Sequence, residues 1–267
     1  MLLGLLLSPG LASVIDSEIK VKNLPLDLAR NQIRNGDQQP YINILQDTLF
    51  SNGFEVYMVE DGVPNLPLKV VRDFDYNKQR LGSPRWQLAQ WNNYNNNLQY
   101  AKVDYRPPYF IYSVEGGNKV EIDPRKGSLK LTLNTSKEYG KNAVNPNNPR
   151  ISGQKWPHLL VSQDYQEGIS LSEQQNIRLV IGYTVENVVD NHLNNSFDSN
   201  LHSAQFQWFI KISNKNPKSL GFEDFFWFGL SFYDFRYEFS PFYANADFNT
   251  TAKFIYMPDM KEVLGEG

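Results

Sequence analysis

Hydrophobic and polar residues alternate over residues 202–212, and a period of two is the pattern of a β-strand with one buried face. A second segment, residues 225–239, is apolar on both faces at first and then carries Asp234, Arg236 and Glu238 at alternate positions. The polar residues between the two segments include the Asn, Pro and Gly typical of turns. The two segments therefore predict neighbouring central strands, with three ionisable groups on one face of the second.

Further strands are predicted wherever the same alternation, or a short apolar run, is bounded by turn residues. They cover residues 53–59, 68–73, 86–91, 109–114, 119–122, 128–133, 156–163, 176–185 and 253–257. Helical spacing occurs only in short, poorly capped patches at residues 26–34 and 42–49. About a dozen strands with few short helices predict an all-β fold, an antiparallel two-sheet β-sandwich of the jelly-roll type.

The domain organisation follows from chain length and from the apolar start of the chain. A chain of 267 residues that is 41% hydrophobic can build one large core, so residues 15–267 are expected to form a single domain. Residues 1–14 are apolar, contain small residues near their end and are too short to span a bilayer, which favours an export signal or its remnant. This interpretation predicts a secreted, cell-surface or periplasmic protein. Because no basic residue precedes the apolar run, an ordinary N-terminal strand is the alternative.

Charge and composition exclude several classes of function. A net charge of −3 gives no reason to expect nucleic acid as a partner, since phosphate backbones are bound mainly by clustered Lys and Arg. The absence of cysteine excludes disulfides, thiolate metal sites and thiol nucleophiles. The sequence has no glycine-rich phosphate loop, no serine nucleophile elbow and no paired-histidine zinc motif. No cofactor and no membrane span are expected, and a structural calcium ion is left open.

Loops and histidines supply further candidates. Residues 141–149 contain two prolines and four asparagines and predict a long, mobile or functional loop. His202, at the start of the first central strand, is a candidate general acid or base, with a structural role at a strand end as the alternative. His158 is a candidate for substrate binding, although its apolar flanks also fit burial. His192 lies in an Asn-rich segment and is expected to be an ordinary loop residue.

The ionisable face of the second central strand can be interpreted in two ways. Asp234 and Glu238 flank Arg236, and two carboxyl groups are what glycoside hydrolysis requires, one as acid and one as base or nucleophile. Glu223, just before the strand, is an alternative member of that pair. The arginine would orient a sugar or bind a uronate carboxylate. The other interpretation is a solvated face of surface ion pairs, which contribute little to stability.

Aromatic residues are abundant, with 5 Trp and 15 Tyr. Flat rings beside amide side chains commonly bind sugar rings, although many of these rings must belong to the core. Trp91 and Tyr233 lie next to amides or charges and are candidates for ligand contact. The accompanying amides are those of Gln90, Gln205 and Gln207.

Several of these strands resemble those of concanavalin-like jelly rolls, a group of proteins that bind or cleave polysaccharides. The segments are residues 86–91, 156–160, 202–207 and 227–236, and the likeness spans residues 85–255. The resemblance implies a sandwich fold and a polysaccharide or oligosaccharide partner. The resemblance leaves open whether this protein is of the hydrolase type or of the lyase type.

The function expected from the sequence is an exported carbohydrate-active protein that binds and cleaves a polysaccharide, as a hydrolase or a lyase. In a lyase, Tyr233 and His202 would exchange the proton while Arg236 and Gln205 neutralise the uronate carboxylate. A non-catalytic glycan-binding module needs the same aromatic side chains but no acid or base. A structural surface protein, with its aromatic rings in the core, is the third alternative.

Overall fold

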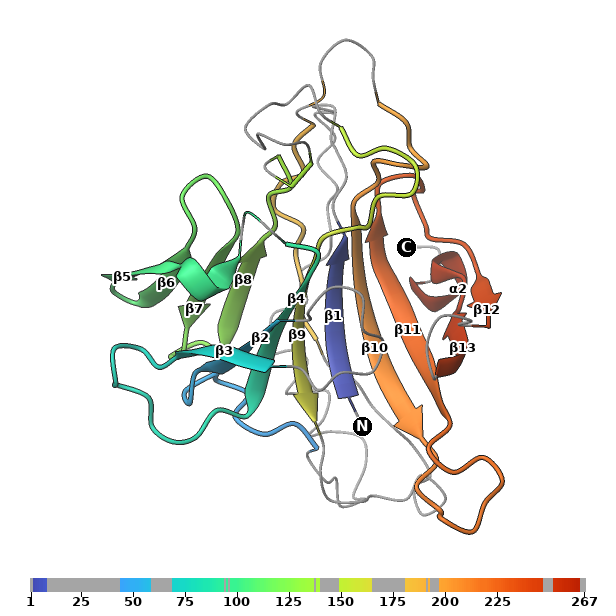
Figure 1. The fold of residues 1–267 in the computed structure, drawn as a ribbon, viewed down its shortest axis with the longest axis horizontal. Coiled ribbons are helices and arrows are strands. Elements are labelled where there is room, and N and C mark those ends of the chain that lie inside the picture. Colours follow the sequence, from blue (N-terminus) through green and yellow to red (C-terminus); the bar gives the residue numbers. More distant parts are fainter. Residues whose placement is uncertain are drawn as a thin grey trace.

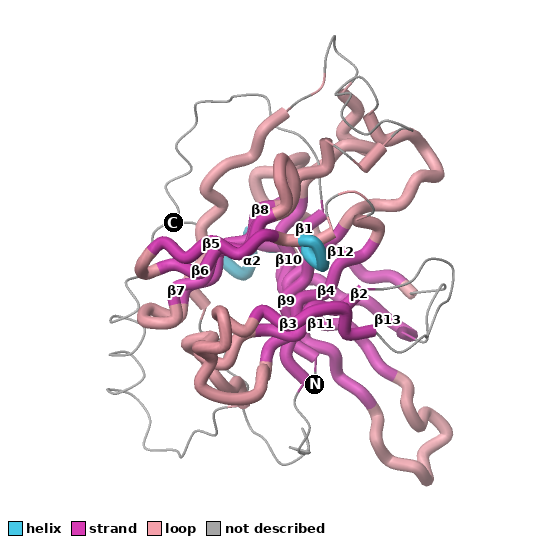
Figure 2. The backbone as a smooth tube through the Cα atoms, turned by 60° about the vertical axis from the view of Figure 1, so that its left-hand side comes forward, coloured by secondary structure: helices cyan, strands magenta, loops and turns pink. Residues whose placement is uncertain are grey.

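A computed structural model describes the greater part of the chain. The described residues are 2–8, 44–58, 69–93, 95, 97–136, 138–139, 149–164, 181–190, 192, 197–246 and 252–264. Within them the chain forms strands and almost no helix, as Figures 1 and 2 show. The prediction of an all-β fold is therefore confirmed.

Among the described residues there are two sheets, and the larger has nine strands. Their order across the sheet is β12 (Tyr243–Asn245), β13 (Ala252–Met257), β11 (Phe225–Asp234), β10 (Gln205–Ser213), β1 (Leu2–Ser8), β9 (His158–Asp164), β4 (Trp86–Trp91), β2 (Phe54–Met58) and β3 (Lys69–Phe74). The predicted hairpin of β2 and β3 and the predicted pair β10–β11 are both antiparallel neighbours. The pairs β2–β4 and β11–β13 are parallel, so the expectation of a wholly antiparallel fold was wrong there. Each parallel pair is possible because one strand of opposite direction lies between its members in the sequence. This strand is β3 between β2 and β4, and β12 between β11 and β13.

The smaller sheet is a meander of four antiparallel strands. These are β5 (Lys102–Arg106), β6 (Tyr109–Ser113), β7 (Lys119–Asp123) and β8 (Ser128–Thr132). The turn before β8 requires glycine, because Gly127 has a φ of +62° and a Cβ there would lie 2.6 Å from the carbonyl oxygen of Thr48. Two short helices complete the described elements, η1 (Leu98–Tyr100) before β5 and α2 (Met260–Leu264) after β13.

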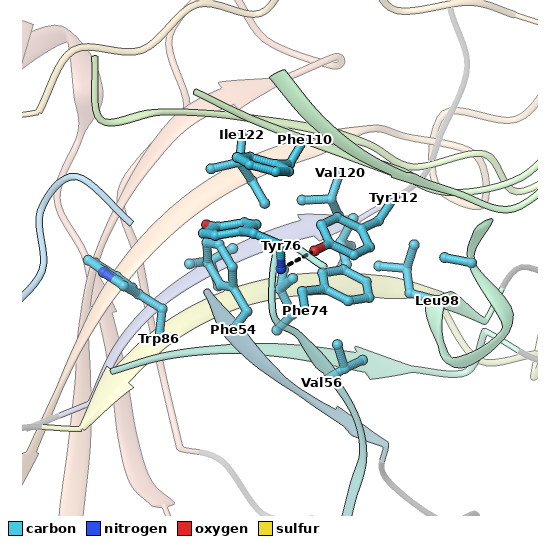
Figure 3. Packing of buried hydrophobic residues seen from close by; sticks show 14 residues of the cluster. Phe54, Val56, Phe74, Tyr76, Trp86, Leu98, Phe110, Tyr112, Val120 and Ile122 are labelled. Carbon is cyan, nitrogen blue, oxygen red and sulfur yellow. Dashed lines mark hydrogen bonds between the residues drawn. The ribbon is translucent and has the colours of Figure 1, made fainter. Parts of the chain in front are cut away.

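The core lies between the smaller sheet and one half of the larger one. Alternate side chains of β2, β3, β4 and β9 face side chains of β6 and β7, as Figure 3 shows for part of the cluster. The buried members on strands are Phe54, Val56, Phe74, Trp86, Leu88, Leu159 and Val161 from the larger sheet and Phe110, Tyr112, Val120 and Ile122 from the smaller one, and Tyr76, Leu98 and Ala101 complete the cluster from outside the strands. Burying each large apolar side chain contributes about 1.5–3 kcal/mol, so this two-layer, sandwich-like packing is a major source of stability.

The second central strand ends earlier than its apolar pattern predicts. β11 stops at Asp234, and the N–H of Tyr237 donates to the carbonyl oxygen of Asp234 at 3.1 Å in the turn that follows. Arg236 and Glu238 belong to this turn and not to the strand, so the prediction that all three ionisable groups share one strand face was wrong. The Asp234 carboxylate stabilises the turn, because it accepts the backbone N–H of Arg236 at 3.0 Å.

Other predicted elements differ from the structure or lie outside the described residues. Residues 181–185, the described part of the strand predicted over 176–185, form no strand, although Tyr183 stacks on Phe232 of β11 with ring centroids 4.3 Å apart. The described part of the second helical patch, residues 44–49, forms no helix. The helical patch at 26–34 and nearly all of the loop at 141–149 lie outside the described residues.

The apolar start of the chain forms a strand inside the larger sheet. β1 pairs antiparallel with both β9 and β10 and separates them. This arrangement corresponds to the second interpretation of the N-terminal segment, an apolar strand. Removal of the segment during export remains a prediction. Within the part of the chain that the structure describes, no helix is long and apolar enough to cross a membrane.

Candidate functional site

Most of the predicted site residues lie at one end of the nine-stranded sheet, which is the upper end in Figure 1. We call it the site end: β4 and β11 finish there, and β9 and β10 begin there. Trp91 is paired with His158 across β4 and β9, and Gln205 is paired with Asp234 across β10 and β11. Strands β4, β9, β1, β10 and β11 are successive neighbours. At about 4.8 Å between neighbouring strands, the site end therefore extends over about 19 Å from β4 to β11.

Asp234 is the centre of a polar cluster at the β11 side of the site end. The residue is 5% exposed, and its carboxylate accepts the side-chain N–H groups of Arg236 at 2.9 Å (Nε) and 2.6 Å (Nη2), and that of Gln205 at 2.6 Å. Burial raises the pKa of this carboxyl, but the hydrogen bonds from Arg236 and Gln205 and the guanidinium charge outweigh burial, so the net pKa is lowered. The carboxylate is thus held ionised and its oxygens are occupied.

The side chains of Tyr233 and Arg236, on either side of Asp234 in the sequence, have different surroundings. Tyr233 pairs with Phe206, whereas Asp234 pairs with Gln205, so the Tyr233 side chain lies on the opposite face of the sheet. Burial, followed by the charge of Asp234, raises the pKa of the Tyr233 hydroxyl. The Arg236 guanidinium carbon lies 5.2 Å from the ring centroid of Tyr237, in a cation–π contact.

Two further predicted residues lie away from the Asp234 carboxylate. Glu238 is exposed in the turn after β11. Gln207 is partly buried on β10 and pairs with Ser231, after an irregularity in the pairing that falls between Phe206 and Gln207. The structure therefore brings Gln205, Asp234 and Arg236 into direct contact and leaves Glu238 outside their hydrogen bonds.

His202 is held by backbone groups on both sides of its ring. Its Nδ1 accepts the N–H of Asp198 at 2.8 Å, which places the ring proton on Nε2, and Nε2 lies 2.8 Å from the carbonyl oxygen of Arg150. The residue is only 5% exposed. Both nitrogens are therefore engaged: Nδ1 binds the backbone of its own segment before β10, and Nε2 joins this segment to the one before β9. This is the structural role considered as the alternative for this residue.

The β4 side of the site end contains an aromatic pair and a network of amides. The rings of Trp91 and His158 meet edge to face with centroids 6.3 Å apart. The Asn93 side-chain amide donates to the carbonyl oxygens of both residues, at 2.8 Å to Trp91 and 2.6 Å to His158. Burial lowers the pKa of His158 to about 4, which outweighs an opposing hydrogen bond with the backbone of Trp156, so this imidazole is neutral at pH 7.

Gln90 is turned away from the surface. It is 2% exposed, its Oε1 accepts the N–H of Leu98 at 2.9 Å, and its Nε2 donates to Asn97 at 3.3 Å. This amide fixes the start of η1, so it supports the site end from within.

Arg150 and His192 lie between the β4 and β11 sides and were not among the predicted site residues. The Arg150 guanidinium carbon lies 4.0 Å from the Trp156 ring centroid, and its Nη1 donates to the carbonyl oxygen of Leu201 at 3.3 Å. His192 lies against His202, with ring centroids 4.1 Å apart. Arg150 has no periodic pattern around it that would reveal its role, but the spacing of Asp190 and His192 is visible in the sequence.

The loop segments of the site end are joined to β11 by aromatic contacts. Phe197 meets the ring of His202 at a centroid distance of 5.9 Å and that of Phe235 at 5.3 Å. Phe235 itself donates its N–H to the carbonyl oxygen of Ala204 at 3.0 Å. These contacts place the histidine pair beside the Asp234 cluster.

The described residues contain no group of three or more His, Cys, Asp and Glu that could hold a metal ion. With its fold and site in view, the chain is an all-β protein of sandwich-like architecture. Its comparison with protein-family models, with curated proteins and with solved structures found no match in any of the three.

Proposed function

We propose that this protein binds a polysaccharide chain along the site end of its nine-stranded sheet. The observation that supports the proposal is the row of aromatic, amide and guanidinium side chains that begins at Trp91 and ends at Arg236. On the same proposal, the two sheets are those of a concanavalin-like jelly roll, and the protein acts outside the cytoplasm.

The chemistry of this row suits a sugar polymer. Aromatic rings supply flat apolar surfaces for sugar rings, and nearby polar groups orient the hydroxyls. Trp91, Trp156 and Tyr237 supply the rings, and Arg150 and Arg236 each lie over one of them. A row about 19 Å long matches an extended ligand better than a small compact one.

Hydrolysis by the predicted carboxylate pair has less support from the geometry. A general acid needs a raised pKa, whereas the pKa of Asp234 is lowered and its carboxylate is engaged by Arg236 and Gln205. Proton exchange between His202 and Tyr233 has little support either, because both nitrogens of His202 are engaged by the backbone and Tyr233 lies on the other face of the sheet. Binding is thus the function that the site supports best.

The test is binding of the full chain to a panel of cellulose, mixed-linkage β-glucan, xylan, alginate and pectate. Release of reducing ends and ultraviolet absorbance by unsaturated products are followed in the same samples. We expect at least one glycan to bind, and Trp91→Ala and Trp156→Ala to weaken its binding about tenfold, as the loss of one stacking contact predicts. Tyr100→Ala is the matched control, because Tyr100 is 74% exposed and lies on η1 rather than in the row.

Two results would contradict the proposal. One is a folded full chain that binds no glycan of the panel. The other is binding that both tryptophan variants leave unchanged, which would move the binding surface elsewhere.

A further inference from the structure

His192 has one ring nitrogen fixed and the other unused. The carboxylate oxygen Oδ1 of Asp190 accepts the backbone N–H of His192 at 2.7 Å and lies 3.2 Å from Nδ1 of its ring. A carboxylate oxygen accepts hydrogen bonds, so Nδ1 carries the proton and Nε2 presents a lone pair. The His192 side chain is only 8% exposed, and Nε2 is buried with no hydrogen-bond partner among the described residues.

His202, whose ring lies against that of His192 at a tilt of 44°, has the opposite proton arrangement. In His202 the proton is on Nε2 and the lone pair of Nδ1 is used by the N–H of Asp198. Of the two imidazoles in contact, only His192 therefore offers an acceptor to a ligand. Burial, followed by repulsion from His202, lowers the pKa of His192 despite the opposing effect of Asp190, so the lone pair is retained at neutral pH.

An unused buried acceptor is unusual in a folded protein. The great majority of buried polar atoms have a partner, and leaving one unpaired costs about 1–3 kcal/mol. Phe197 and His202 pack against the His192 ring, so the ring itself is firmly placed. An oriented ring with a fixed tautomer and an unpaired acceptor has the properties that recognition of a hydrogen-bond donor requires.

We infer that Nε2 of His192 is a recognition point for a hydroxyl group of the bound glycan, and that Asp190 positions it. The inference rests on the proposed function and adds a residue that sequence patterns assign to an ordinary loop. The ligand class is a polyhydroxylated chain, since a hydroxyl donates to the lone pair without introducing charge into a buried place. Because Nε2 is closed to solvent, binding includes a small local rearrangement that opens a path to it.

The experiment uses nuclear magnetic resonance of the full chain labelled with nitrogen-15 in its histidines. The chain has only 3 histidines, so the ring nitrogens give few signals. We expect the free protein to show His192 with a protonated Nδ1 and an unbonded Nε2. Addition of a neutral β-1,4-glucan hexasaccharide or a β-1,4-mannuronate hexasaccharide should move the Nε2 signal of His192 to the position of a hydrogen-bonded nitrogen and leave the Nδ1 signal of His202 in place.

Two variants keep the inference testable by calorimetric binding measurements. His192→Phe retains a ring of similar size against Phe197 but has no lone pair, and we expect it to lower affinity for the bound hexasaccharide at least tenfold without lowering the unfolding temperature. Asp190→Ala releases Nδ1, so the ring proton can move to Nε2 and occupy the acceptor; affinity should fall about fivefold. The variant's Nε2 signal should then become that of a protonated nitrogen, which a merely structural role for Asp190 would not require.

The outcomes separate the inference from the proposed function. Binding of a hexasaccharide with an unchanged His192 signal, or with full affinity in His192→Phe, would overturn the inference and leave glycan binding intact. An Nε2 that is already hydrogen-bonded in the free protein would show that the acceptor has a partner without any glycan, and would also overturn it. Failure of both hexasaccharides to bind would overturn the proposed function and the inference together.

Discussion

The hydroxyl of Tyr112 accepts the backbone N–H of Tyr76 at 2.9 Å, and this bond joins the two sheets inside the core (Figure 3). Tyr112 lies on β6 of the smaller sheet, and Tyr76 follows β3 of the larger one. Both are fully buried, at 1% and 2% exposure, and the Tyr112 ring stacks on Phe74 with centroids 3.7 Å apart. The two layers are thus held in register by a polar contact as well as by apolar packing.

Tyr112→Phe should destabilise the fold although it keeps the ring. The N–H of Tyr76 would be left buried and without its acceptor, which costs about 1–3 kcal/mol. The free energy of unfolding, measured by urea denaturation, checks this. Tyr100→Phe is the control, since Tyr100 is 74% exposed and its hydroxyl can be solvated by water. Equal stability of the two variants would show that the Tyr112 hydroxyl is dispensable.

Gly229→Ala should disturb the β10–β11 pair. A Cβ at Gly229 would lie 2.3 Å from Cε1 of Phe209 and 3.0 Å from the carbonyl oxygen of Trp208 on the neighbouring strand. Phe209 is 5% exposed and has little room to move, so we expect a loss of about 1–3 kcal/mol in the free energy of unfolding. A Cβ at Gly182 meets no atom of the described residues within 4 Å, so Gly182→Ala should change stability by less than about 0.5 kcal/mol. A neutral Gly229→Ala would mean that the Phe209 ring moves aside freely.

Arg236→Ala should cost more than the loss of an ordinary surface ion pair. It removes the guanidinium from the carboxylate of Asp234, whose side chain is 4% exposed, while the Arg236 side chain itself is 29% exposed. Because solvent partly screens the pair, we expect about 1–3 kcal/mol rather than the larger cost of breaking a fully buried one. Arg236→Lys keeps the charge but loses the two-point contact and should fall between the wild type and Arg236→Ala. A change below about 0.5 kcal/mol in the free energy of unfolding would instead support the interpretation of a solvated surface ion pair.

His158 should make stability depend on pH between about 4 and 6.5. The pKa of His158 falls from its ordinary 6.5 to about 4 on folding, mainly through burial, so in this range the unfolded chain binds a proton that the folded one does not. The unfolded state is therefore favoured as pH falls from 6.5, by up to about 3 kcal/mol near pH 4. Unfolding midpoints in urea at pH 7 and pH 4.5 measure this loss. His158→Phe should reduce it, and an unchanged pH dependence in that variant would assign the effect to other groups.

The strands of the core were predictable because their signal is local. Residues 86–91 alternate so that Trp86 and Leu88 share a face, and the structure places that face in the core as β4. The hairpin of β2 and β3 follows from two apolar runs separated by turn residues. A strand needs only its own side-chain periodicity to show which face is buried, so one sequence is enough to indicate it.

The contacts of the site end could not be predicted in this way. The end of β11 depends on one carboxylate that binds the N–H and the guanidinium of Arg236, whereas the local apolar pattern continues to Phe239. Residues 181–185, the described part of the strand predicted over 176–185, form no strand because alternation alone does not supply a pairing partner. The availability of the His192 lone pair depends on which partners Asp190 and His202 find in space, and neither His192 nor His202 shows this by spacing alone.

The sequence by itself determined the all-β class, most strand positions and the predominance of aromatic and amide side chains on them. Those properties follow from side-chain periodicity and turn chemistry, which act over a few residues. Only the tertiary structure decided the strand order, the parallel pairs β2–β4 and β11–β13, and the gathering of Trp91, His158, Gln205 and Asp234 at one end. These properties depend on which distant segments pair, and pairing is decided by burial and hydrogen bonding across the whole chain.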